Sequence, residues 1–111
     1  MDLSSLSKLT QLKHLTLKHV DATGIAPLRP LVNLETLILQ GTETEDLSAL
    51  AGMNKLAELD ISYSKVQDVS PLLKLKSLKT VNVYGVEGLD VEELQERKGL
   101  KILRERKQRI E

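Results

Sequence analysis

The chain has 111 residues, a length that suits a single domain. Its 16 basic and 16 acidic residues cancel, so the composition favours neither a nucleic acid nor a membrane as partner. The absence of Cys excludes disulfides, a thiolate nucleophile and a cysteine-based zinc site, and the absence of Phe and Trp leaves an aliphatic core. No basic segment precedes an apolar run, and no window approaches about 18 apolar residues. We therefore expect neither a signal peptide nor a transmembrane helix, which predicts a cytoplasmic protein.

Aliphatic residues recur at intervals of 22 positions along most of the chain. Stepping by this interval gives six columns, with one member in each of four turns. The columns are Leu3, Ile25, Leu47 and Val69; Leu6, Leu28, Leu50 and Leu72; Leu9, Leu31, Met53 and Leu75; Leu12, Leu34, Leu56 and Leu78; Leu15, Leu37, Leu59 and Val81; and Leu17, Leu39, Ile61 and Val83. Every member is aliphatic or Met in a chain that is only 41% hydrophobic, so the pattern indicates a structural repeat.

Each repeat contains an alternating L-x-x-L-x-L segment, which is typical of a short strand with one buried face. We predict strands near residues 14–18, 36–40, 58–62 and 80–84. The segment that leads into each next strand has aliphatic residues three positions apart, which favours a short helical or 3₁₀ return leg. Pro27 and Pro71 open two of these legs, where a missing backbone donor costs least, and Pro30 argues against a long helix in the first.

A single turn of this length cannot bury its own leucines, but stacked turns can bury them against one another. The predicted fold is therefore α/β. It is a right-handed solenoid with a curved parallel sheet along one side and short helical or 3₁₀ return legs along the other. Each leucine of a column is expected to contact its equivalents in the neighbouring turns.

Residues 1–88 form four repeats in this interpretation, and residues 89–111 form a C-terminal helical cap with an edge strand and a basic tail. Asp90 followed three residues later by Glu93 is a signal for the start of a helix. Gly99 is a natural stop for that helix. The cap is thus predicted to begin with a helix that ends near Gly99.

The last part of the cap is predicted from a partial return of the repeat. Leu100 and Leu103 fall in the columns again, which predicts a fifth, edge strand near residues 101–104. Glu105 stands where the next aliphatic residue is expected. Residues 104–111 are therefore predicted to form a frayed helix or a tail.

Two segments of the repeat carry a family resemblance. Residues 66–72 read Val-Gln-Asp-Val-Ser-Pro-Leu, and residues 44–50 read Thr-Glu-Asp-Leu-Ser-Ala-Leu. Together with the columns of residues 3–86, they resemble the 22-residue leucine-rich repeats of internalin-like bacterial proteins. The resemblance implies a leucine-rich-repeat solenoid and a bacterial protein-interaction module.

The chain departs from that family in the residue after each strand. The family places Asn there, where its amide bonds the backbone of neighbouring loops, whereas this column reads Val20, Thr42, Ser64 and Val86. Thr and Ser can replace part of such a ladder, and Val cannot. The family's N-terminal cap and secretion signal are also not recognisable, so the host-cell adhesion of internalins is not expected of this chain.

The leucines of the first turn have no preceding turn to cover them. Terminal repeats of solenoids normally need a polar outer face. We therefore expect this end to be covered by a partner protein, a second copy of the chain, or residues outside this sequence.

No constellation of residues favours catalysis or a cofactor. His14 and His19 are five positions apart across a strand and a loop, without an obvious third metal ligand, so two surface histidines are the favoured interpretation.

Glu58 and Asp60 share a strand face about 7 Å apart, a spacing that also suits a glycosidase pair, but a charged binding face is the simpler interpretation. The basic residues between 97 and 109 could contact phosphate, but a solvated face is favoured because no stacking aromatic residues accompany them. We predict no enzyme activity, no metal and no cofactor.

The outward, concave side of the predicted sheet, which we call the strand face, is the favoured binding surface. Its candidate partner-binding residues are Tyr63, Tyr84, Ile38, Glu58, Asp60 and His14. The two tyrosines are the only aromatic residues, and Ile38 is apolar where water is expected. Ile38 can equally be an ordinary strand former, and Tyr84 can be a cover for the cap. The predicted function is a non-catalytic module that binds a protein partner. The alternatives are a self-associating structural scaffold and a substrate-recognition fragment of a larger protein.

Overall fold

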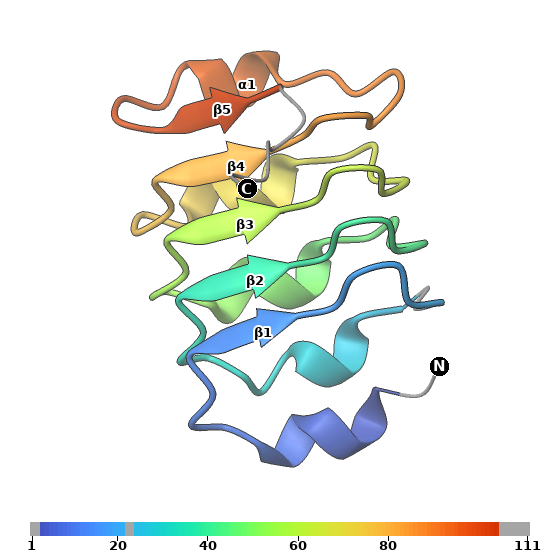
Figure 1. The fold of residues 1–111 in the computed structure, drawn as a ribbon. Helices are drawn as coiled ribbons and strands as arrows, with labels where there is room; N and C mark the ends of the chain where they lie inside the picture. Colours follow the sequence, from blue (N-terminus) through green and yellow to red (C-terminus); the bar gives the residue numbers. More distant parts are fainter. Residues whose placement is uncertain (1–2, 22–23, 105–111) are drawn as a thin grey trace, which may run out of the picture.

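The computed structural model describes residues 3–21 and 24–104. Strands and short helical legs alternate along this part of the chain (Figure 1). In chain order they are η1 (Ser4–Lys8), β1 (His14–Thr16), η2 (Ala26–Leu28), β2 (Thr36–Ile38), η3 (Ser48–Gly52), β3 (Glu58–Asp60), η4 (Ser70–Lys74), β4 (Thr80–Asn82), α1 (Glu92–Gln95) and β5 (Lys101–Leu103). The η elements are 3₁₀ helices. The strands form one layer and the legs form a second layer behind it, so the predicted solenoid with a sheet on one side is confirmed.

The sheet is parallel throughout, with the strand order β1-β2-β3-β4-β5. The strands are shorter than predicted, because each ends two residues early at the start of a tight turn. Main-chain pairing nevertheless continues past β1, since the amide of Leu17 donates to Ile38 at 2.7 Å and that of His19 donates to Gln40 at 2.8 Å. The fifth strand, predicted near 101–104, is confirmed as β5.

The last turn is one residue shorter than the others, which corrects one prediction. Leu37 pairs with Leu59 across 22 residues, but Val81 pairs with Ile102 across 21. Ile102 therefore takes the inward position that the 22-residue interval assigned to Leu103. Leu103 instead pairs with Asn82 and stands on the outward side of the sheet.

The core is one continuous cluster made almost entirely of the six aliphatic columns. Members from the second, third and fourth turns are buried throughout. The first turn differs, because Leu6, Leu12 and Leu15 are only partly buried and Leu9 is 48% exposed. The leucines of the first turn therefore form an apolar end of the described structure, and what covers that end stays a prediction.

An aspartate precedes three of the return legs and fixes how each begins. One carboxylate oxygen accepts the amide of the residue two positions later, from Asp46 to Ser48 at 2.8 Å and from Asp68 to Ser70 at 2.9 Å. Asp90 receives the amide of Glu92 at 2.9 Å in the same way. These hydrogen bonds lower the pKa of Asp46 and of Asp68 below the usual value of an Asp carboxyl.

The turn after each of the strands β1 to β4 contains one residue in the left-handed backbone conformation. These residues are His19, Gly41, Tyr63 and Gly85, with φ of 55°, 71°, 59° and 73°. Ring-bearing residues and glycines alternate, and each ring lies against the glycine of the next turn. A Cβ atom at Gly85 would be 2.7 Å from Cδ1 of the Tyr63 ring, and one at Gly41 would overlap Nδ1 of His19. The glycines thus provide both the backbone conformation and the space that the rings occupy.

The column that carries Asn in the resembling family makes local bonds here. The hydroxyl of Thr42 donates to the carbonyl of Leu39 at 2.9 Å and pairs with the hydroxyl of Thr44 at 2.9 Å. Ser64 accepts the amide of Val66 at 3.4 Å, and Val86 is buried. Thr and Ser therefore satisfy polar groups within their own turn.

The C-terminal helix is shorter than predicted. It ends at Gln95, and Gly99, at φ 84°, belongs to the turn that enters β5. Arg97 replaces an aliphatic residue of the repeat, and its guanidinium donates to the carbonyls of Leu75 at 2.8 Å and Leu72 at 3.3 Å. Arg97 thereby caps carbonyl groups of the preceding leg. The predicted tail beyond residue 104 lies outside the described residues.

The glycine at position 85 yields a stability prediction. Gly85→Ala should lower the free energy of unfolding by at least about 1 kcal/mol, because Ala is strained at positive φ and its Cβ meets the Tyr63 ring. Gly52→Ala is the matched control, since a Cβ there meets nothing within 4 Å. Urea unfolding followed by circular dichroism measures both. Equal midpoints for the two variants would contradict the packing described here.

The aspartates that begin the legs yield a pH prediction. A carboxyl with a lowered pKa in the folded chain stabilises that state above the unfolded pKa of about 3.9, and this contribution is lost as the pH falls through the folded value. Asp46→Ala and Asp68→Ala should therefore lower the urea midpoint at pH 7 and approach the wild-type midpoint as the pH falls through the lowered pKa of the folded chain. Glu45→Ala, in the same exposed loop, is the control. A difference that persists unchanged at low pH would show that these carboxylates do not act as described.

Candidate protein-interaction face

The strand face consists of the side chains that alternate outward from the five strands. The strand register places them in two rows that cross the sheet. The first row is His14, Thr36, Glu58, Thr80 and Lys101. The second row is Thr16, Ile38, Asp60, Asn82 and Leu103. Because neighbouring strands are about 4.8 Å apart, each row is a nearly even series of side chains along the solenoid axis.

Polar residues of the second row also brace the turns that follow their strands. Oδ1 of Asp60 accepts both the amide and the hydroxyl of Ser62, at 2.8 and 2.6 Å. Oδ1 of Asn82 accepts the amide of Tyr84 at 3.0 Å in the equivalent place on β4. Asp60 is half-buried, and Asn82 is buried. Asp60 therefore holds the turn that carries Tyr63 as well as presenting a carboxylate on the strand face.

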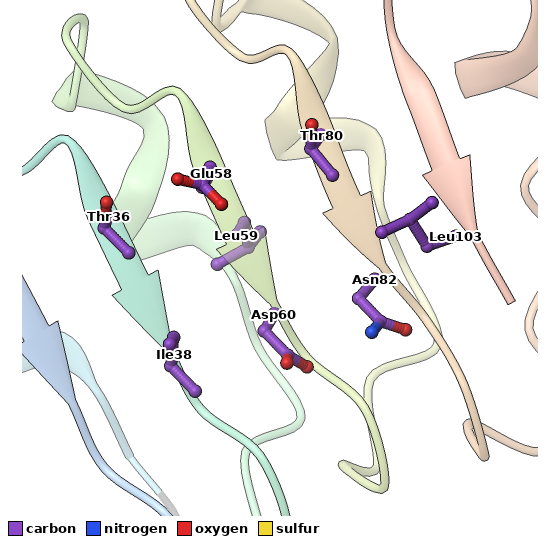
Figure 2. Close-up of a pocket in the computed structure, with 8 residues that line it drawn as sticks. All are labelled: Thr36, Ile38, Glu58, Leu59, Asp60, Thr80, Asn82 and Leu103. Atoms are coloured by element: carbon purple, nitrogen blue, oxygen red, sulfur yellow. The ribbon is translucent and has the colours of Figure 1, made fainter. Parts of the chain in front are cut away.

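A shallow hollow lies at the centre of the strand face and brings three of the predicted residues together (Figure 2). Its lining residues are Thr36, Ile38, Glu58, Leu59, Asp60, Thr80, Asn82 and Leu103. Ile38, Glu58 and Asp60 were predicted as partner-binding residues, and the structure places all three here. Leu103 was missed because the shorter last turn moves it outward, a change that the aliphatic pattern does not reveal.

The two tyrosines lie beyond the strands, at the edge of the strand face. Their ring centroids are 5.3 Å apart, and the rings are nearly perpendicular at 84°, a geometry that aromatic pairs favour. Tyr63 is 42% exposed and Tyr84 is half-buried. Tyr63 also lines a second, open hollow in the loops with Ser64, Lys65, Gln67, Gly85 and Glu87. The tyrosines thus extend the strand face toward the loops and do not enter the central hollow.

His14 stands apart from the other predicted residues. It is exposed on the edge strand β1, two strands from Glu58 in the first row. His19 lies against Gly41 in the following turn. Within residues 3–21 and 24–104, no group of three or more His, Asp or Glu side chains is placed to hold a metal ion.

Comparison with known proteins identifies the fold. No family model matches the sequence, and no curated protein matches it. The structure is similar to that of an internalin (inlF) of Listeria monocytogenes, with a TM-score of 0.84 and 25% identity over 93% of this chain. It is also similar to internalin C2 of the same organism, with a TM-score of 0.85 and 27% identity over 94% of this chain. The chain spans 31% and 46% of the length of these two proteins.

These similarities confirm the predicted leucine-rich-repeat fold of the internalin-like type. The parallel sheet and the short 3₁₀ legs agree with them. An internalin-like repeat fold suggests a protein-interaction module in general, and the Listeria neighbours suggest a bacterial origin. Across the described residues, the helices are too short and too polar for any of them to traverse a lipid bilayer.

Substitutions at Asp60 separate the contribution of its hydrogen-bond acceptor from that of its negative charge. Asp60→Ala removes an acceptor of two hydrogen bonds and should lower the free energy of unfolding by about 1–2 kcal/mol. Asp60→Asn should cost less than half of that, because Asn82 shows that an amide oxygen makes the same bond on β4. Urea unfolding measures both variants. If Asn proves as damaging as Ala, the carboxylate charge and not the acceptor geometry stabilises this turn.

Proposed function

We propose that this leucine-rich-repeat solenoid is a non-catalytic module that binds a protein partner through its strand face, in a bacterial cytoplasm. The observation that carries the proposal is the composition of the central hollow. Ile38 and Leu103 are apolar side chains that remain partly accessible on either side of two carboxylates. Packing within the solenoid does not require these residue types, because their side chains point away from the core.

The area of the strand face indicates which residues outside the strands belong to the proposed binding site. Five strands at about 4.8 Å spacing span about 19 Å, so the rows alone offer only a few hundred Å². A standard interface covers about 800 Å² on each partner. The tyrosine pair extends the surface, and Tyr63 is exposed enough to serve as an anchor. The proposed site therefore comprises Ile38, Glu58, Asp60, Tyr63 and Tyr84, with His14 at its edge.

A structural role is the second candidate function. The exposed Leu9 and the partly buried Leu6, Leu12 and Leu15 form an apolar end next to the edge strand β1. A second copy that stacked there would make the chain a self-associating scaffold.

The proposed function predicts a specific pattern of affinity losses. For a partner isolated from the native host, Tyr63→Ala and Ile38→Ala should each weaken binding about tenfold, because buried apolar anchors dominate most interfaces. Val32→Ala is the matched control, since Val32 is an exposed apolar residue outside the strand face. Titration calorimetry gives the dissociation constants, and thermal unfolding verifies that the variants fold.

Unchanged affinity in both Tyr63→Ala and Ile38→Ala, or a loss confined to Val32→Ala, would place the binding surface elsewhere. Sedimentation velocity tests the scaffold in parallel. A mass that rises with concentration and returns to the monomer value in Leu9→Glu would favour self-association over partner binding.

A further inference from the structure

The first row of the strand face carries opposite charges two strands apart. The carboxylate of Glu58 lies on the central strand β3, the neutral Thr80 follows on β4, and the ammonium of Lys101 lies on β5. On the other side of Glu58, the neutral Thr36 separates it from His14 on β1. The two charged positions, Glu58 and Lys101, are therefore separated by two strand spacings.

The second row places apolar side chains beside the same acidic centre. Asp60 is preceded across the sheet by Ile38 and followed by Asn82 and Leu103. Figure 2 shows Glu58 and Asp60 on β3, with Ile38 on the β2 side and Leu103 on the far side of Asn82. The surface thus has an acidic middle with an apolar residue toward each end.

No base of the described chain neutralises this acidic middle. The direct cross-strand neighbours of Glu58 are Thr36 and Thr80, and within residues 3–21 and 24–104 no Lys or Arg forms an ion pair with Glu58 or Asp60. The ion pair formed by Lys65 lies in the loops, where it joins Glu43 at 3.1 Å. Among the described residues, the two carboxylates are therefore left accessible to a cation of another molecule.

The spacing of the row discriminates between a helical and an extended partner. Two strand spacings are about 9.6 Å. Residues seven apart on one face of an α-helix are about 10.5 Å apart along its axis. Side chains on one face of an extended chain repeat every ~6.8 Å, which gives ~6.8 or ~13.6 Å and matches the row poorly. The whole face, about 19 Å across, corresponds to roughly 13 residues of helix.

We infer that the strand face receives an amphipathic α-helix of the partner protein, lying across the five strands along the two rows. A Lys or Arg of this helix faces Glu58 and Asp60, and an acidic residue about two turns away faces Lys101. Apolar residues between them contact Ile38 and Leu103. The inference rests on the proposed function, and it adds the structure and charge pattern of the bound element.

The charges set orientation and register more than total affinity. Each exposed ion pair changes affinity by about fivefold or less, and salt weakens it. A helix with charges complementary to Glu58, Asp60 and Lys101 should therefore bind about tenfold more tightly than its charge-reversed counterpart at low ionic strength. This preference should shrink at about 0.5 M salt.

Synthetic helical peptides test the inference directly. The probe is a 15-residue Ala- and Leu-rich peptide with Glu at the first and last positions, Lys at the centre, and Leu between them on the same face. Its counterpart exchanges Glu and Lys, and a third peptide has prolines beside the central Lys to prevent helix formation. Each is titrated into the full ¹⁵N-labelled chain, and amide chemical shifts report both affinity and location. The first peptide should bind about tenfold more tightly than the other two and shift amides of β2 to β5.

Reversing the charge at Glu58 tests the same charge pattern from the side of the protein. Glu58→Lys should weaken binding of the first peptide and strengthen binding of a peptide with Glu at its centre. Glu45→Lys makes the same change of charge in an exposed loop outside the strand face and should alter neither. Equal binding of the proline peptide, or equal effects of the two Lys variants, would overturn the helical inference. The proposed function would still hold if Ile38→Ala and Tyr63→Ala weakened the native partner.

Discussion

The stacking of equivalent leucines in successive turns is the constraint on which the rest of this structure depends. Each turn buries its aliphatic residues only against the turns beside it, so equivalent residues must meet from turn to turn. This stacking holds the strands in parallel register, at an interval of 22 residues between the first four strands and 21 before the last. That register places outward side chains in straight rows about 4.8 Å apart. The geometry of the proposed binding surface is thus a consequence of how the core packs.

The turns after the strands add specific side-chain contacts to the surface of this regular stack. After each of the first four strands, the turn contains a left-handed residue, which alternates between a ring-bearing residue and glycine. This alternation lets the ring of Tyr63 lie over Gly85, near the edge of Tyr84. Asp60 holds the same turn through Ser62 while it remains on the strand face. Loop structure and binding surface therefore share residues, and changes at Asp60 affect both.

The proposed function uses outward positions that do not contribute to the core. The inward columns accept only aliphatic residues, whereas outward positions differ from turn to turn within the same backbone geometry. The central strand has two carboxylates at these positions, and the strands around it have Thr, Ile, Asn and Leu. A solenoid fold by itself does not specify a partner. The chemistry of these outward residues supports a basic, partly apolar partner element.

The sequence by itself determined the repeat interval, the parallel solenoid and the outward positions of the first four strands, because alternation and aliphatic spacing are local properties of the chain. It therefore predicted Ile38, Glu58 and Asp60 on the outward side of the sheet, where the register places them. Only the tertiary structure decided the one-residue shortening of the last turn, which brings Leu103 and Lys101 onto the strand face. It also decided that Arg97 caps carbonyls of the preceding leg and that Tyr63 packs on Gly85. These features depend on contacts between residues more than 20 positions apart, and the three-dimensional stacking of the turns sets such contacts.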